Sequence, residues 1–260
     1  MSEIVRGRRI FVKIWLQLAL GLCMVLSSAA GGQGTESSPK LLLLSAEFNS
    51  LNSSIRDRTI KKSAAKEQFR ELIKALREEY YSSGGNKFSV SDWVFPLQGY
   101  GYTAIGGFRG NGYQVGGYSY FDGNKHTGHP SQDIFIRDKK FVSLDDVSKK
   151  PVRVLSVSGG VVVAVENRWD ISSSLRGGKY IWIYDPTAEA LLYYAHNSKL
   201  LVDVGTLVSP GDSIAEVGRT GLNAHKRRSP THLHLTYLSI VNGLPEPKNI
   251  YKELLSSRLL

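Results

Sequence analysis

The stretch VRVLSVSGGVVVAV, residues 152–165, decides the class of fold. It contains two short runs rich in β-branched residues, Val152–Val157 and Val161–Val165, separated by Gly159-Gly160. β-branched side chains favour strands, and paired glycines mark turns. The stretch therefore predicts two strands joined by a tight turn.

Similar runs continue along the chain at Tyr180–Tyr184 and Leu191–Ala195, with turn residues between them. No second long helical pattern appears before a short tail near Ile250–Ser256. The 26 glycines and 10% aromatic residues also favour many strands and tight turns. We therefore predict that residues 86–260 form one mainly β domain, a compact antiparallel β-sheet.

One helix is predicted before this domain. Apolar residues recur at steps of three and four from Ile60 to Tyr81, with charged residues between them, and Ser82-Ser83-Gly84-Gly85 ends the pattern. Residues 31–58 are interpreted as a linker, so that residues 31–85 comprise a linker and one amphipathic helix. The helix is expected to pack against the main domain as a prop. A partner-binding helix and a brake on the active site are the alternatives.

The N-terminus has the order of a secretory signal peptide, predicted at residues 1–30. Four basic residues precede the apolar stretch Ile14–Leu26, and small residues follow it. That stretch is too short to span a bilayer comfortably, although an uncleaved anchor is the alternative. We expect export to the periplasm or cell envelope, with no stable membrane span after cleavage. Cys23 is the only cysteine, so the mature chain would have neither disulfides nor thiolate zinc ligands.

The chain carries a net charge of +10, of which residues 1–30 contribute +3, four basic residues against Glu3. The remaining +7 would favour an anionic partner such as a cell-wall polymer, a membrane surface or nucleic acid. Ordinary solubility explains the charge equally well. The sequence has no dense Lys/Arg run interleaved with aromatic residues, so we do not expect nucleic-acid binding.

All six histidines lie between positions 126 and 234, and five of them fall in three informative settings. His126 and His129 stand seven and four residues before Asp133, which opens a β-prone run. His196 ends the run Tyr193-Tyr194-Ala195. His232 and His234 alternate with Leu233, so on a strand both imidazoles would point to one face.

Two histidines on one face and a carboxylate from another segment form a ligand set well suited to zinc. A catalytic zinc site takes three protein ligands and leaves the fourth position for water. Each short motif alone is a weak signal, and the hypothesis of a metal site depends on their conjunction in one domain. His126 is a weaker candidate ligand than His129, because it lies seven residues from Asp133 rather than four.

Four segments in order resemble the lysostaphin-type zinc endopeptidases, also called LytM-like peptidases. The resemblance extends from about Phe95 to Tyr251, and order, spacing and residue identity agree. It implies a compact, barrel-sandwich-like antiparallel β structure with a groove for an extended peptide. The segments are Gly128-His129-x3-Asp133-Ile134, Tyr194-Ala195-His196, Val204-Gly205-x2-Val208-x2-Gly211-Asp212-x-Ile214-x2-Val217-Gly218-x-Thr220-Gly221 and Thr231-His232-Leu233-His234.

The resemblance also implies residue roles. His129, Asp133 and His234 would be the zinc ligands. His232 and His196 would act in catalysis, by orienting or deprotonating the attacking water and by stabilising the oxyanion. The implied function is that of an exported zinc endopeptidase that hydrolyses peptide cross-links or stem peptides of bacterial peptidoglycan.

Three features depart from the family pattern or remain unassigned. Ser131 stands where the family usually has glycine, and a small serine should be tolerated. The loop Leu222–Thr231 carries a basic run, residues 225–228, that has no assigned role. The Gly/Tyr-rich stretch Gly99–Tyr120 is either one wall of the groove or a set of turns between edge strands.

Two other functions remain as alternatives. A catalytically silent module that binds the cell wall and regulates other wall hydrolases would keep the fold and lose metal ligands, whereas this chain retains the motif residues. The hairpin around Val204–Gly218 resembles carriers of biotin or lipoate. Its tip, Ser209-Pro210-Gly211-Asp212, lacks the lysine that such a carrier needs.

Overall fold

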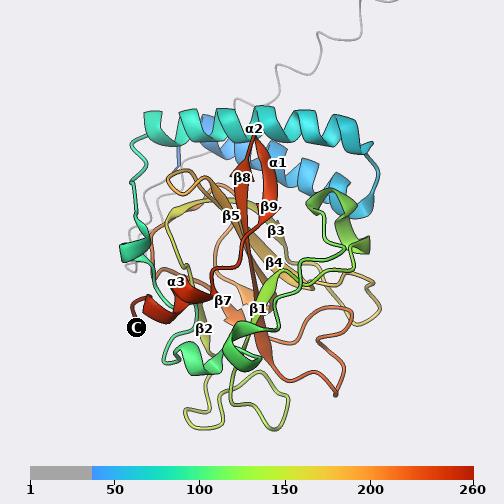
Figure 1. Cartoon of the computed structure of the whole chain (residues 1–260), viewed down its shortest axis with the longest axis vertical. Helices are drawn as coiled ribbons and strands as arrows, with labels where there is room; N and C mark the ends of the chain where they lie inside the picture. The colour runs from blue at the N-terminus through green and yellow to red at the C-terminus, as the bar shows by residue number, and fades with distance from the viewer. Residues whose placement is uncertain (1–36) are drawn as a thin grey trace, which may run out of the picture. The chain divides into compact units, whose positions relative to one another are not determined.

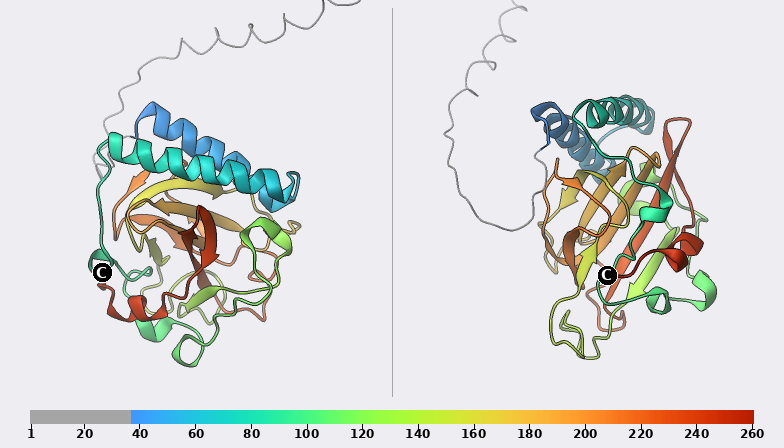
Figure 2. Two further views of the ribbon diagram at one scale, coloured as in Figure 1. Left: turned by 45° about the horizontal axis from the view of Figure 1, so that its top comes forward. Right: turned by 90° about the vertical axis from the view of Figure 1, so that its left-hand side faces the viewer.

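A computed structural model of the chain describes residues 37–260. In it, two long helices lie over a twisted antiparallel sheet (Figures 1 and 2). The predicted signal peptide, residues 1–30, lies outside the described residues. From residue 37 onward, no helix is long and apolar enough to cross a membrane.

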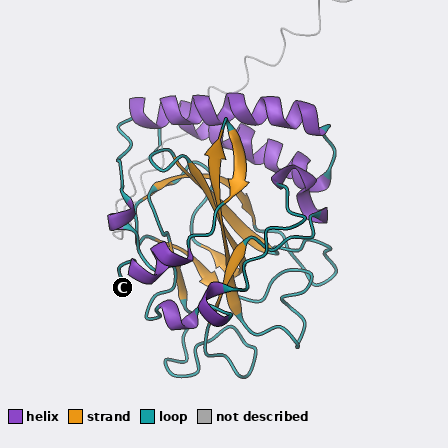
Figure 3. Cartoon of the chain, in the orientation of Figure 1, coloured by secondary structure: helices purple, strands orange, loops and turns teal. Residues whose placement is uncertain are grey.

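The α-helices are α1 (Pro39–Asp57), α2 (Lys62–Ser82) and α3 (Tyr251–Ser256), and four short 3₁₀ helices lie in the connections (Figure 3). These are η1 (Val90–Asp92), η2 (Tyr102–Ala104), η3 (Phe108–Gly110) and η4 (Tyr120–Lys125). The strands are β1 (Ser131–Phe135), β2 (Arg153–Leu155), β3 (Gly160–Glu166), β4 (Lys179–Asp185), β5 (Ala190–Leu200), β6 (Leu207–Val208), β7 (Ser213–Val217), β8 (His232–Val241) and β9 (Leu244–Pro247).

All strand pairs are antiparallel, as the sequence predicts. The main order is β1-β8-β5-β4-β3-β6, and β9 pairs with β8. β7 pairs with both β2 and β5. The runs at 152–165 form β2 and β3, which confirms the predicted strands. Because β8 lies between β1 and β5, it joins segments that are far apart in the sequence.

Both faces of the sheet are covered, which explains why its central strands are continuously apolar. In β4, Ile181 and Ile183 belong to the core on one face, while Trp182 and Tyr184 belong to the core on the other. The second core also contains Phe69 and other buried side chains of α1 and α2. The two helices therefore cover the face to which Trp182 points.

α2 confirms the helix predicted at 60–81, and it ends where the Ser-Ser-Gly-Gly run begins. Its residues Ala65, Phe69, Ile73, Leu76 and Tyr80 are buried at the expected spacing. α2 thus packs on the sheet domain, as expected of a prop.

The interpretation of residues 31–58 as a linker is wrong for residues 39–57, which form α1. Its buried stripe contains the polar residues Ser45 and Asn52 among the apolar ones, and these hide the helical period in the sequence. A start signal was present, because the Ser38 hydroxyl caps the helix by accepting from the Leu41 amide at 3.0 Å and Pro39 occupies the first turn. The domain is therefore preceded by two helices rather than one.

Candidate active site and metal centre

The pairing of β8 with β1 and β5 builds the site. Asp133 of β1 lies directly opposite His234 of β8, and His234 lies opposite Ala195 of β5, the residue before His196. His232 and His234 project to one face of β8, as the alternation predicts. Residues from three separate strands therefore meet on one face of the sheet, the same face that α1 and α2 cover further along.

Asp133 is the centre of the first group. Its Oδ1 lies 3.0 Å from His234 Nδ1, and its Oδ2 lies 3.3 Å from His129 Nε2. The ligand atoms of His129, Asp133 and His234 all lie within 4.8 Å of one another. This is close enough for one cation to bind all three after small adjustments.

His196 and His232 lie beside this group. Their rings are 4.9 Å apart, and His232 Nε2 is 3.7 Å from Asp133 Oδ1. His196 Nδ1 bonds to the Thr220 carbonyl at 2.8 Å, and His232 Nδ1 bonds to the Pro230 carbonyl at 2.7 Å. A carbonyl can only accept, so in the neutral rings each Nδ1 carries the proton and each Nε2 is a free base.

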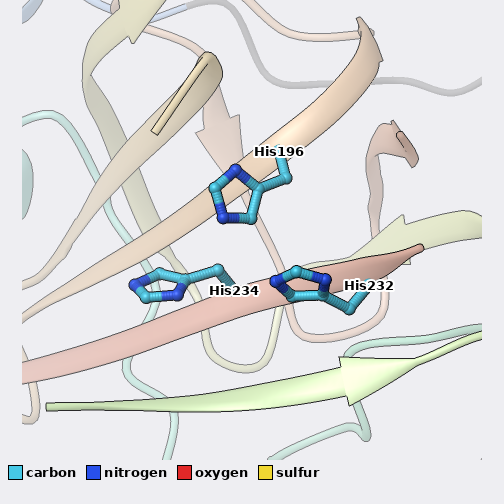
Figure 4. Close-up of side chains that lie close together, drawn as sticks. All are labelled: His196, His232 and His234. Carbon is cyan, nitrogen blue, oxygen red and sulfur yellow. The ribbon is translucent and has the colours of Figure 1, made fainter. Parts of the chain in front are cut away.

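The ligand atoms of His196, His232 and His234 also lie within 4.8 Å of one another (Figure 4). The two groups share His234, so the five residues singled out in the sequence form one cluster. His126 belongs to neither group: its ring contacts the Tyr118 ring at 4.7 Å, and its Nδ1 lies 3.0 Å from the Gly128 carbonyl.

The ionisation states suit a divalent cation. Burial raises the pKa of Asp133, but hydrogen bonds from His129 and His234 outweigh it and hold that pKa well below its usual range. Burial lowers the pKa of His196 far below its ordinary value, and it also lowers that of His234. The hydrogen bond to Asp133 instead raises the pKa of His129. The carboxylate of Asp133 and the neutral imidazole of His234 are the forms in which these side chains bind a metal.

Ser131 is the site residue whose contribution sequence reasoning missed. Its hydroxyl lies 2.7 Å from His234 Nε2 and 2.5 Å from Thr236 Oγ1. Because this contact engages Nε2, the Nδ1 atom of His234 faces Asp133. The serine that replaces the usual glycine thus orients a predicted ligand. Its position two residues before Asp133, on the same face of a strand, was the available signal.

His196 has an unusual backbone. Its φ is +68°, and the pairing of β4 with β5 is shifted at this point, so His196 lies on a bulge. The His196 amide donates to the Gly177 carbonyl at 2.9 Å. A Cβ at Gly221 would lie 2.9 Å from His196 Nδ1. Left-handed backbone in a non-glycine residue is costly, so it is held here by its surroundings.

The cluster opens into a cavity of about 290 Å³. Aromatic rings form a continuous wall away from His234: Tyr193 lies 6.1 Å from the His234 ring and stacks on Trp182 at 4.5 Å, and Trp182 contacts Tyr120. Asn52 of α1 lies at the far end, where it donates to the Tyr180 hydroxyl and accepts from the Tyr120 hydroxyl, both at 3.1 Å.

The unassigned segments contribute unequally to this cavity. Tyr118 and Tyr120 line it, so the end of the Gly/Tyr-rich stretch forms part of a wall. From the loop Leu222–Thr231, the lining residues are Asn223, Ala224 and Ser229, none of which is basic. α1 lines the cavity through Asn52, Ile55 and Arg56, whereas no residue of α2 does.

Part of the chain is similar to a known family of peptidases. The model of peptidase family M23 matches residues 143–244, a span that includes His196, His232 and His234 and begins after Asp133. The catalytic domain of lysostaphin from Staphylococcus simulans is 26% identical over 52% of this chain and 85% of that domain, with a TM-score of 0.35. A Ruminococcus gnavus protein assigned as a glycyl-glycine endopeptidase, LytM, is 19% identical over 86% of this chain and 90% of its own, with a TM-score of 0.43. Among curated proteins, none matches this chain.

An antiparallel sheet that gathers histidines and a carboxylate at a cavity is an arrangement suited to a metallopeptidase site. Residues 143–244 are similar to peptidase family M23. This match confirms the family resemblance seen in the sequence and agrees with a metallo-endopeptidase.

Gly221→Ala tests whether backbone strain at the site is held by its neighbours. Gly221 has a φ of +117°, and an added Cβ would lie 2.4 Å from the Arg176 carbonyl oxygen. We expect the free energy of unfolding to fall by about 1–3 kcal/mol, measured by urea denaturation. Gly116→Ala is the matched control, because an added Cβ there meets nothing within 4 Å, and its effect should stay within about 0.5 kcal/mol. Equal free energies of unfolding for the two variants would show that the structure accommodates a side chain at position 221 without strain.

Proposed function

We propose that this protein is an exported, zinc-dependent endopeptidase that hydrolyses peptide cross-links or stem peptides of bacterial peptidoglycan. The observation that carries the proposal is the convergence of His129, Asp133 and His234 within 4.8 Å at a cavity of an M23 peptidase. His196 and His232 stand beside them. This combination supports hydrolysis more directly than a silent regulatory role.

Zinc is the metal that this donor set fits best. Imidazole nitrogens with one carboxylate oxygen and an open position are typical of catalytic zinc sites. We assign His129, Asp133 and His234 as the ligands rather than His196, His232 and His234. The first set includes the half-buried Asp133 carboxylate, and an anion that has lost part of its hydration is stabilised by a cation beside it.

When bound, zinc polarises the scissile carbonyl and lowers the pKa of the attacking water. The chain's own residues then manage the proton. The free Nε2 atoms of His196 and His232 can only accept, because each Nδ1 proton is donated to a backbone carbonyl. The ring that takes the proton from water becomes a donor, and as a donor it can stabilise the oxyanion or protonate the leaving amine.

Peptidoglycan as the substrate follows from the family and from the expected location. The predicted signal peptide would deliver the enzyme to the compartment where that polymer lies. A mature charge of +7 would help to retain it on an anionic wall. The known relative lysostaphin is an antimicrobial peptidase, and the Ruminococcus gnavus protein is assigned as a glycyl-glycine endopeptidase.

Digestion of muropeptides tests this function. Zinc-loaded protein is expected to convert cross-linked muropeptide dimers into monomers and to leave glycan strands intact, because the site is built to attack amides. A chelator should abolish the conversion, and added zinc should restore it. The measurement is chromatography with mass analysis of the fragments. Shortened glycan, or a dimer pool that stays unchanged, would instead favour the silent regulator.

Substitution of the assigned ligands tests the metal site. His129→Ala, Asp133→Ala and His234→Ala are each expected to lower zinc content well below one ion per chain, because each removes one of three protein ligands. His225→Ala is the matched control, since His225 lies outside both histidine groups. Elemental analysis after dialysis gives the result. Unchanged zinc in the His234 variant would show that the ligand assignment is wrong.

A further pair of variants separates metal binding from catalysis. His232→Ala and His196→Ala should keep one zinc per chain and lose turnover by roughly 10²–10⁴-fold, as is usual when a positioned acid–base group is removed. The measurements are zinc content and the initial rate of dimer cleavage on the same preparations. Near-full hydrolysis by zinc-loaded His232→Ala would refute its catalytic role. Loss of zinc from both variants would instead favour the all-histidine ligand set.

A further inference from the structure

We infer that Arg176 binds a carboxylate of the substrate close to the scissile bond, so that the enzyme prefers peptides that carry a free carboxylate there. The inference rests on the proposed function and names a specificity residue for the same site. It follows from the charges that line the cavity, from the bonds that Arg176 makes, and from its place beside His196.

Three lining side chains carry a formal charge, apart from the histidines: Arg56, Asp133 and Arg176. Arg56 is neutralised, since it pairs with Asp57 at 2.8 Å and with Glu166 at 2.7 Å. The Asp133 carboxylate is in contact with His129 and His234, and the proposed metal would neutralise its charge. Arg176 forms no ion pair with any acidic residue between positions 37 and 260.

The guanidinium of Arg176 has spare donors. It offers five N–H groups, and its one side-chain hydrogen bond within the described residues goes to the His126 carbonyl. The side chain is half-buried, so part of its hydration is lost without a compensating anion. A guanidinium in this state matches a carboxylate, which can accept two parallel N–H bonds.

Arg176 is also held close to the reacting atoms. The next residue, Gly177, accepts the hydrogen bond from the His196 amide, and a Cβ at Gly177 would lie 1.8 Å from the Tyr193 hydroxyl oxygen. The Arg176 amide in turn donates to Asn124 Oδ1 at 3.1 Å, which anchors the loop. The Arg176 backbone is therefore fixed beside that of His196, and its guanidinium, bonded to the His126 carbonyl, lines the same cavity as the histidine cluster.

The test compares muropeptide dimers that have free carboxylates with the same dimers converted to carboxamides. For the wild-type enzyme, kcat/KM should be roughly 10- to 100-fold higher for the free form, as expected for a hydrogen bond to a charged group, and the difference should lie in KM. Arg176→Gln should abolish this preference. Arg176→Lys, which keeps the charge without the planar fork, should retain part of it.

Arg168→Gln is the matched control, because Arg168 is an exposed cation of the same loop that does not line the cavity. It should keep the full preference. Dimers amidated only at the C-terminal carboxylate separate the two sources of the anion. Loss of the preference identifies the terminal carboxylate, and retention identifies a side-chain carboxylate.

Equal kcat/KM for free and amidated dimers in the wild-type enzyme would overturn the inference while leaving the peptidase function intact. If zinc-loaded enzyme cleaves neither form, the proposed function fails, and calorimetric binding of the same dimers decides the role of Arg176. Tighter binding of the free form that Arg176→Gln loses would uphold the carboxylate site. Equal binding of both forms would exclude it.

Discussion

The site depends on the register of β8 between β1 and β5. That register places Asp133 opposite His234 and, two residues away on the same face, Ser131 opposite Thr236. A slip of one residue would turn both imidazoles of β8 to the other face, among the apolar side chains of the first core. Burial on both faces therefore stabilises the arrangement of the site as well as the fold, because the same slip would take Leu233 and Leu235 out of the first core.

A second constraint acts on β5, whose bulge turns His196 toward His232. The left-handed backbone of His196 costs conformational free energy. The glycines at 178 and 221 allow neighbouring segments to pack closely enough to hold His196 in this conformation. The bonds from Nδ1 of His196 and of His232 to carbonyls then fix both tautomers. The strained backbone, the close packing at the two glycines and the fixed tautomers therefore all position the same pair of histidines.

The helices and the site share one face of the sheet, and this links the N-terminal segment to specificity. α1 covers part of the face, and Asn52 closes the end of the cavity through its bonds to Tyr120 and Tyr180. The cavity therefore runs from the histidine cluster to a wall supplied by α1, a segment outside the region that matches the family model. A segment interpreted from sequence as a linker thus lines the cavity beside the candidate site.

The sequence by itself determined the antiparallel sheet, the helix predicted at 60–81 and the five residues that the structure brings into one cluster, because alternation, helical spacing and the motif pattern are local properties of the chain. It did not reveal α1, whose buried stripe contains Ser45 and Asn52. Asn52 is compatible with burial because Tyr120 and Tyr180, from distant segments, form hydrogen bonds with its amide. The contact of Ser131 with His234, the strained backbone of His196 and the place of Arg176 in the cavity were likewise decided by tertiary structure. Each depends on which distant segment lies opposite, and strand order and register settle that only when the whole sheet is formed.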